Sequence, residues 1–287
     1  MRFAYLIMAH NRFDVLEYLL KDLDDERNDI YLHIDKKVKN CNFESLKACV
    51  KKSKLFLVKR QKVYWGSYSQ IKCVVSLLKE ATNRDRYDYY HFMVGVEFPI
   101  KTQDYIHNFF EKNKGKEFVG FDDKMDFTNR IKYYYPFGKY ARSKNKIQRK
   151  LYKLCRFSLK VQYKLGVSRL RHDKDYYKKG YANWSITHDF ASLIVGNTKK
   201  IRKEYRLTSC ADEMCFHTLL YHSPYYKNVF DINDEYKSVM RYTTWNNRFN
   251  RISLTDIPKL LKTDYLFVRK IDGEDAIDVI KEILKNR

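Results

Sequence analysis

The chain has 287 residues and a formal net charge of +22, from 57 Lys and Arg against 35 Asp and Glu. With 44% hydrophobic residues, among them 25 Tyr and 18 Phe, it can bury a sizeable core, which excludes an intrinsically disordered chain. Only 9 Gly and 4 Pro exclude a collagen-like or linker-like chain. The charge indicates an anionic partner: nucleic acid, acidic phospholipid or a phosphorylated small molecule.

The start of the chain carries no signal for membrane insertion or secretion. Its apolar run, residues 3–9, ends at His10 and is too short to cross a membrane. It also lacks the form of a signal peptide, so we expect a mature protein that begins at Met1 in the cytosol. The six cysteines form no CxxC pair and no regular spacing with His, which favours small buried side chains over a zinc site.

Residues 2–121 alternate short β-like runs with amphipathic helical patterns. In the segment 69–81, Ile71, Val74, Val75 and Leu78 form one apolar helical face. The alternation predicts a mostly parallel sheet flanked by helices. The expected strands are 3–9, 30–34, 55–58, 89–94 and 117–121, and the expected helices are 15–23, 43–51, 69–81 and 103–112.

Ligands of such sheets bind beyond the carboxyl ends of the strands, where this chain has His10, Asp35 and the loop 95–101. An Asp at this edge can accept a hydrogen bond from a base or a ribose, although a strand-end Asp more often caps a turn. The loop could present Glu97 and Lys101 to a polar ligand, or could simply connect a strand to a helix.

Residues 139–179 contain 15 Lys or Arg and two Asp, with Tyr, Phe and Leu interleaved. This composition predicts an amphipathic basic helix within an insertion. The simplest interpretation of this segment is a solvated basic surface. The alternatives are that it contacts a membrane surface or an acidic polymer, or that it contacts nucleic acid.

After Gly180 the α/β pattern resumes. We expect strands at 181–186 and 236–242, an extended stretch at 265–271, and helices at 189–195, 211–221 and 256–262. A closing helix has Ile277, Ile280 and Leu284 on one face. With no repeat and no Pro/Gly linker, the chain is predicted to form one domain.

Three further segments could carry chemistry. Trp65, Gly66 and Ser67 form a turn before a helix that could bind an anion, or Ser67 or Ser69 could be an ordinary helix cap. Asp212 and Glu213 begin a predicted helix, where acids are favoured by the helix dipole but where one could also be a general base. The basic tail suits a pyrophosphate, with ion pairing to Asp256 or Asp272 as the rival reading; its cations include Arg241, Arg248, Arg251 and Lys270.

Taken together and in this order, these segments resemble the core-2/I-branching family of β-1,6-N-acetylglucosaminyltransferases, which also includes peptide O-xylosyltransferases. The resemblance spans nearly the whole chain, with 122–179 matching poorly. The matched segments are 5–10, 33–37, 63–69, 92–102, 180–187, 211–213 and 266–272.

The resemblance implies a GT-A-like fold and an inverting transfer from a UDP-sugar without the usual metal. The family's catalytic base falls on Glu213, and its uridine contacts fall on Met8 and Asp35, with His10 at the same sheet edge. Basic residues take the place of the metal at the diphosphate. These are Lys270 and either Arg241 or Arg248, a choice that spacing leaves open.

The acceptor pocket of the family falls on Glu97 and Trp184, to which we add Trp65 and Asp212 as sugar-site candidates. No metal ligands and no cofactor are expected, because Lys and Arg would stabilise the charge of the departing UDP. The sequence has no well-placed Asp-x-Asp, and Asp122 and Asp123 are the tempting substitute.

We therefore expect one α/β, GT-A-like domain with a basic helical insertion. Residues 1–121 would bind the nucleotide, 122–179 would form the variable insertion, and 180–287 would carry the catalytic, acceptor and diphosphate groups. The animal enzymes are anchored Golgi proteins with paired cysteines, whereas this chain has scattered cysteines and is expected to have no anchor. The expectation is a bacterial relative in the cytosol, peripheral at the inner face of an anionic membrane.

The expected reaction moves a sugar, with GlcNAc as the leading donor, to a hydroxyl of a glycan or lipid-linked oligosaccharide in surface polysaccharide synthesis. The alternatives are a xylosyl- or other hexosyltransferase of the same fold, or a non-catalytic basic protein that binds acidic polysaccharide or nucleic acid. The sequence contains no nucleic-acid-binding motif that would support the nucleic-acid alternative. The presence of Glu213 argues against a catalytically inactive member of the family.

Overall fold

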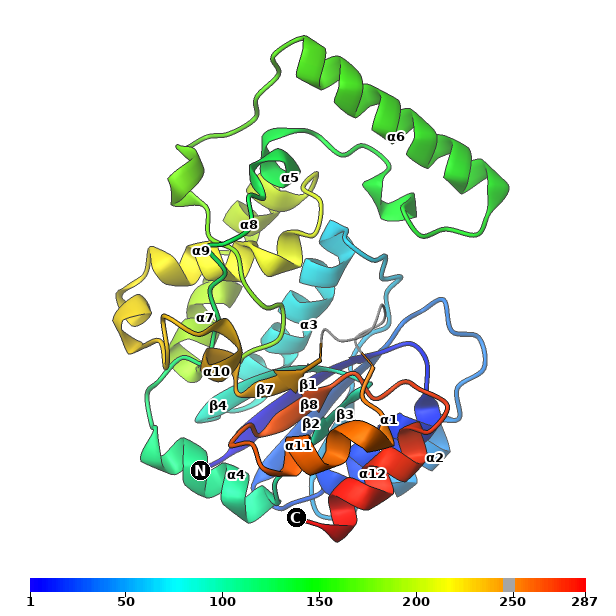
Figure 1. Ribbon diagram of the computed structural model, residues 1–287, viewed down its shortest axis with the longest axis vertical. Helices are drawn as coiled ribbons and strands as arrows, with labels where there is room; N and C mark the ends of the chain where they lie inside the picture. The colour runs from blue at the N-terminus through cyan, green and yellow to red at the C-terminus, as the bar shows by residue number, and fades with distance from the viewer. Residues whose placement is uncertain (245–250) are drawn as a thin grey trace.

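A five-stranded sheet lies at the centre of the computed structural model, which describes residues 1–244 and 251–287 (Figure 1). Four neighbouring strands are parallel and the fifth is antiparallel at one edge. In spatial order the strands are β3 (Lys54–Leu57), β2 (Asn28–Ile34), β1 (Phe3–Ala9), β4 (Tyr89–Val94) and β6 (Ser185–Thr187). The predicted fold class, a mostly parallel mixed sheet flanked by helices with a basic helical insertion, is confirmed.

Successive side chains of β1 enter two separate hydrophobic cores. Phe3, Tyr5 and Ile7 pack on one face of the sheet, and Ala4 and Leu6 pack on the other. This follows from the two-residue period of a strand that is covered on both sides. The first face is covered by α1 (Phe13–Asp22), α2 (Phe43–Ala48), α4 (Gln103–Lys112), α11 (Ile257–Leu261) and α12 (Ala276–Lys285). The second is covered by α3 (Tyr68–Arg84), α7 (His188–Gly196), α8 (Thr198–Tyr205) and α9 (Cys215–Tyr221).

A second, three-stranded sheet is formed by β5 (Glu97–Pro99), β8 (Phe267–Arg269) and β7 (Arg241–Thr243). β8 is its central strand, antiparallel to β5 and parallel to β7. β5 was not predicted, since the sequence suggested a loop at 95–101. The second sheet brings the end of the chain back to the strand ends of the first.

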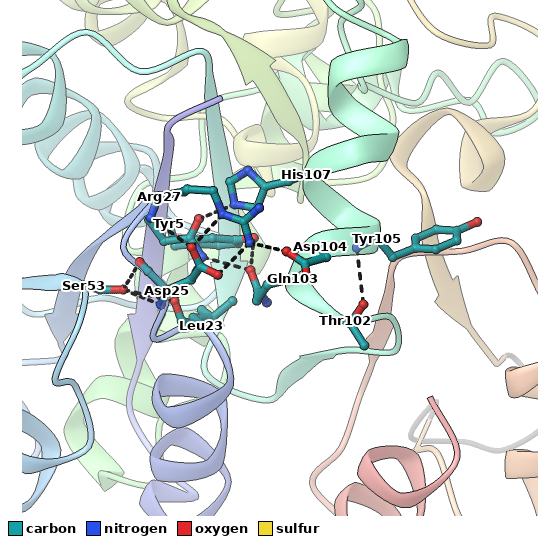
Figure 2. A network of polar contacts seen from close by, with 11 residues as sticks. Tyr5, Leu23, Asp25, Arg27, Ser53, Thr102, Gln103, Asp104, Tyr105 and His107 are labelled. Atoms are coloured by element: carbon teal, nitrogen blue, oxygen red, sulfur yellow. Dashed lines mark hydrogen bonds and ion pairs between the residues drawn. The ribbon is translucent and has the colours of Figure 1, made fainter.

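Polar contacts tie the amino ends of the central strands to α4 (Figure 2). Arg27 contacts both Asp25 and Asp104, with nitrogen-to-oxygen distances of 2.7 Å. Asn28 at the start of β2 donates to Gln103 at 2.9 Å. This end of the sheet is thereby closed by structural contacts.

Three predicted elements are wrong, and a fourth, the strand 181–186, is present only at its end as β6. Residues 117–121 form only single bridges, in which Glu117 pairs with Val229 and Phe118 with Ser185. Residues 236–242 do not form one strand: Asp234 caps the short helix α10 (Glu235–Val239), which precedes β7. The predicted helix 211–221 is interrupted at Met214, which separates the 3-10 turn Ala211–Glu213 from α9.

The insertion contains the short helix α5 (Thr128–Lys132) and the long helix α6 (Lys146–Lys164). Figure 1 shows α6 outside the body of the molecule, at the end opposite α11 and α12. Among the described helices, none has the length and apolar character needed to cross a bilayer. Five of the six cysteines are buried, as predicted, and all six are free thiols.

Gly180 should be intolerant of a side chain, because an added Cβ would overlap the carbonyl oxygen of Gly120 and come within 2.8 Å of His217. We expect Gly180→Ala to lower the free energy of unfolding by about 1–3 kcal/mol in urea denaturation, the usual cost of overpacking. Gly196→Ala is the matched control, because an added Cβ there meets nothing within 4 Å. Equal free energies of unfolding for the two variants would contradict this close approach.

Candidate functional site

A cavity of about 560 Å³ opens at the carboxyl ends of β1, β2 and β4. Its floor is formed by residues 8–11 and 94–96 and by Asp35. Gly95 allows the first two segments to meet, since an added Cβ would come within 2.7 Å of the Ala9 side chain. The cavity therefore lies where the parallel topology places a ligand.

Met8, His10 and Asp35, the residues predicted for the nucleotide, all line this cavity. Asp35 is only 4% exposed, and one carboxylate oxygen accepts a hydrogen bond from the Lys37 backbone N–H at 2.8 Å. The Lys37 ammonium lies 3.2 Å from its other oxygen. Partial burial lowers the pKa of His10 more than Asp35 raises it, which favours the neutral imidazole.

The cavity wall carries more positive than negative charge. Its five cationic side chains outnumber two carboxylates, Asp35 and Asp272. Asp272 is also bonded to Arg251 at 2.9 Å. An anion can therefore be held here by several charge-assisted contacts. The cations are Lys37, Lys139, Arg142, Arg269 and Lys270.

Lys270 and Arg269 enter the cavity from the end of β8. Burial and the neighbouring Arg269 charge lower the pKa of Lys270. Arg269 donates a long hydrogen bond of 3.4 Å to the Tyr181 hydroxyl. An anionic ligand would relieve the repulsion between these adjacent cations.

The loop before α3 faces the insertion across the cavity mouth. Trp65 is 48% exposed, and the Arg142 guanidinium lies 3.5 Å from its ring centre. Lys139, Ser143 and Gln148 of the insertion complete this wall. Trp65 was predicted as a sugar-site residue. The insertion residues were missed, because the sequence does not show which part of the basic segment folds back onto the strand ends.

Arg241, Glu97 and Trp184 lie outside the cavity lining and are fully buried. Arg241 donates to the carbonyl oxygens of Val239 at 2.7 Å, Phe92 at 3.2 Å and Trp184 at 3.1 Å. Burial raises the pKa of Glu97 to about 7, against the opposing effect of Arg241, whose Nε is 3.7 Å away. These three predicted site residues thus occupy supporting positions in this structure.

Asp212 adjoins the cavity through Gln70, a cavity residue that donates a 3.0 Å hydrogen bond to its carboxylate. Burial and the adjacent Glu213 raise the pKa of Asp212 to about 7. Glu213 follows in the same 3-10 turn and lies outside the cavity lining. Its carboxylate is 34% exposed and forms a 2.6 Å ion pair with Arg130.

The remaining predictions concern Arg248 and the metal. Arg248 lies outside the described residues. Asp122 forms a 2.5 Å ion pair with Lys179. Within residues 1–244 and 251–287, no group of three His, Cys, Asp or Glu side chains is placed to hold a metal ion.

Comparison with known proteins relates this chain to one enzyme family. Residues 3–259 match the model of the Core-2/I-Branching enzyme family. Xylosyltransferase 2 from Canis lupus familiaris is 23% identical over 270 residues, which cover 86% of this chain, and the protein from Rattus norvegicus is equally similar. The chain spans about a quarter of the length of these relatives, since the match covers 27% of each.

Solved structures give weaker similarities. Mouse xyloside xylosyltransferase 1 in its apo form aligns with a TM-score of 0.40 and 8% identity, covering 93% of this chain and 97% of the other. The S. aureus TarS fragment 1–349 aligns with a TM-score of 0.29 and 10% identity, covering 47% of this chain and 41% of the other. The family match extends from β1 into α11, and so includes most of the segments that line the cavity but not Arg269, Lys270 and Asp272. The chain belongs to the Core-2/I-Branching enzyme family.

Proposed function

We propose that this chain is an inverting, metal-independent glycosyltransferase that moves a sugar from a UDP-sugar to a hydroxyl of a glycan acceptor. The observation that carries the proposal is the cavity at the carboxyl ends of the parallel strands, lined by five cations and two carboxylates, in a member of this enzyme family. A nucleoside diphosphate matches this chemistry, because it combines a polar base and ribose with two adjacent anionic phosphates.

In the proposed complex, the nucleoside occupies the floor formed by Met8, His10 and Asp35. The Asp35 carboxylate would accept hydrogen bonds from the uracil or the ribose. The diphosphate would then lie near Lys270 and Arg269 at the end of β8. Their fixed positive charge would stabilise the negative charge that develops on departing UDP, which is the contribution a metal ion makes in other transferases.

The acceptor hydroxyl needs a base that removes its proton while the new glycosidic bond forms at C1 and the bond from C1 to the phosphate oxygen breaks. We assign this role to Glu213, with Arg130 holding its carboxylate in position. Asp212, hydrogen-bonded to Gln70, would fix the turn against the cavity wall. We assign the exposed ring of Trp65 to the sugar.

The leading donor sugar in this proposal is GlcNAc, transferred to the acceptor through a β-1,6 linkage. Xylose is the second candidate, favoured by the names of the relatives in dog and rat.

Thermal stabilisation by a panel of UDP-sugars, UDP and uridine tests the proposal directly, because a ligand at a hundredfold excess over its Kd adds about 2.7 kcal/mol to the stability of the folded state. Stabilisation by UDP and by one UDP-sugar is expected. If no nucleotide of the panel stabilises the protein, with or without Mn²⁺, the proposal is refuted.

Glu213→Gln should abolish sugar transfer while leaving UDP binding nearly unchanged. The amide keeps the size of the side chain but cannot accept the proton, so we expect a fall in kcat of about 100-fold or more. Radiolabelled sugar transfer and calorimetric titration with UDP measure the two effects. Glu111→Gln makes the same change on an exposed carboxylate of α4 and should leave both quantities unaltered. An active Glu213→Gln enzyme would place the base elsewhere.

Lys270→Ala should weaken UDP binding much more than uridine binding. The lysine is assigned to the diphosphate, and a hydrogen bond to a charged group contributes about 1.5–3 kcal/mol, equivalent to a tenfold or larger rise in the Kd for UDP. Lys285→Ala at the end of α12 is the control for the loss of one positive charge. Equal losses of affinity for UDP and uridine would contradict the assignment.

Removal of divalent metal should leave transfer intact, because the proposed charge stabilisation comes from lysine and arginine side chains. Initial rates measured with excess EDTA are expected to match those measured without it. A complete loss of activity that Mn²⁺ restores would instead favour Asp122 or Asp123 as metal ligands, after the Lys179 ion pair is broken.

A further inference from the structure

Helix α6 is the most strongly basic element of the described chain and also stands farthest from its sheets (Figure 1). Its 19 residues include seven Lys or Arg and no Asp or Glu. At 1.5 Å per residue, the helix presents this charge along roughly 28 Å. Such a length of uniform positive charge is suited to an extended anionic partner.

The same helix exposes a stripe of large apolar side chains. Ile147, Leu154 and Val161 follow one another at intervals of seven residues, and Leu165 extends the row by one further turn. Seven residues nearly complete two helical turns, so these side chains share one face. Phe157 lies beside them, and the five side chains are between 38% and 73% exposed.

A different side of α6, roughly a quarter turn from the stripe, is attached to the rest of the molecule. Cys155 is fully buried, and the Gln162 side-chain amide exchanges two hydrogen bonds with the Tyr134 backbone, at 2.8 and 2.9 Å. At the start of the helix, Ser143 donates to Gln148 at 2.6 Å. The apolar stripe is therefore not the surface through which α6 packs on its own protein.

We infer that α6 docks on an anionic phospholipid bilayer, lying in the plane of the interface with its apolar stripe among the acyl chains. The two observations fit together, because lysines and arginines beside the stripe can reach lipid phosphates while the stripe leaves water. An acidic polymer would use the cations but would leave Ile147, Leu154 and Leu165 in water. The exposed apolar row thus favours a membrane over a polymer.

This docking would set the position of the donor cavity. Lys139 and Arg142 of the segment that leads into α6, and Gln148 within the helix, also line the cavity. A docked α6 would hold the cavity mouth beside the bilayer. If the proposed function is correct, the acceptor is then a glycan carried by a membrane lipid.

The test is co-sedimentation of the full chain with vesicles of phosphatidylcholine alone or with 30% phosphatidylglycerol. We expect binding to the anionic vesicles only, weakened by 0.5 M salt. A triple variant that reverses three charges of α6 should reduce the vesicle affinity by on the order of tenfold or more: Lys150→Glu/Lys153→Glu/Arg156→Glu. A second triple variant that makes the apolar stripe polar should also reduce the vesicle affinity, although this variant leaves every charge in place: Ile147→Ser/Leu154→Ser/Leu165→Ser.

The matched control is Lys259→Glu/Lys262→Glu/Lys285→Glu, which makes the same charge change on α11 and α12 at the opposite end of the molecule (Figure 1). It should change the vesicle affinity less than twofold. Calorimetric titration with UDP on each variant verifies folding and separates the two hypotheses. Vesicle binding without UDP binding would refute the proposed function alone, and UDP binding without vesicle binding would refute the docking alone.

Two further results would overturn the docking. Equal losses in the α6 and control charge variants would mean that overall charge attracts the protein to the vesicles. The second result has two parts. The protein would fail to bind anionic vesicles, and it would bind immobilised heparin or DNA equally well with and without the serine substitutions. That result would identify an acidic polymer as the partner of α6.

Discussion

The buried guanidinium of Arg241 fixes the relative position of the two sheets. It extends from β7 in the smaller sheet to the Phe92 carbonyl oxygen on β4, and to the Trp184 carbonyl oxygen beside β6. Burial lowers the pKa of Arg241 and raises that of Glu97, and the charge of each residue partly offsets the cost of burying the other. β7 is paired with β8, so Arg241 anchors the same sheet from which Arg269 and Lys270 enter the cavity.

The sequence predicted the parts of this structure that depend on local pattern. The alternation of apolar runs located β1, β2 and β4, and the strand ends then placed His10 and Asp35 at one edge, to which the family resemblance added Met8. It failed where a short polar interaction competes with an apolar run. The Asp234 side chain caps α10, although the residues that follow it have the composition of a strand.

The role of Arg241 shows a different limit. An arginine beside an apolar strand looks the same in a sequence whether it faces a ligand or a row of carbonyl oxygens. Its full burial distinguishes the two cases, and burial depends on the packing of β4, β6 and β7, which are far apart in the chain. The contact between Trp65 and Arg142 was unpredictable for the same reason, since it joins the loop before α3 to the insertion.

The charge of +22 has two distinct physical settings in this molecule. In the cavity, a few cations converge from separate strands and loops on a space of about 560 Å³, an arrangement that suits one compact anion. On α6, the cations lie along a single exposed helix with no common focus, so they suit a surface of many anions. The segment 139–148 belongs to both settings, because four of its residues line the cavity and the segment runs into the start of α6. Any force that orients α6 therefore also acts on the wall of the cavity, and the insertion is the element through which the surroundings of this protein would reach its site.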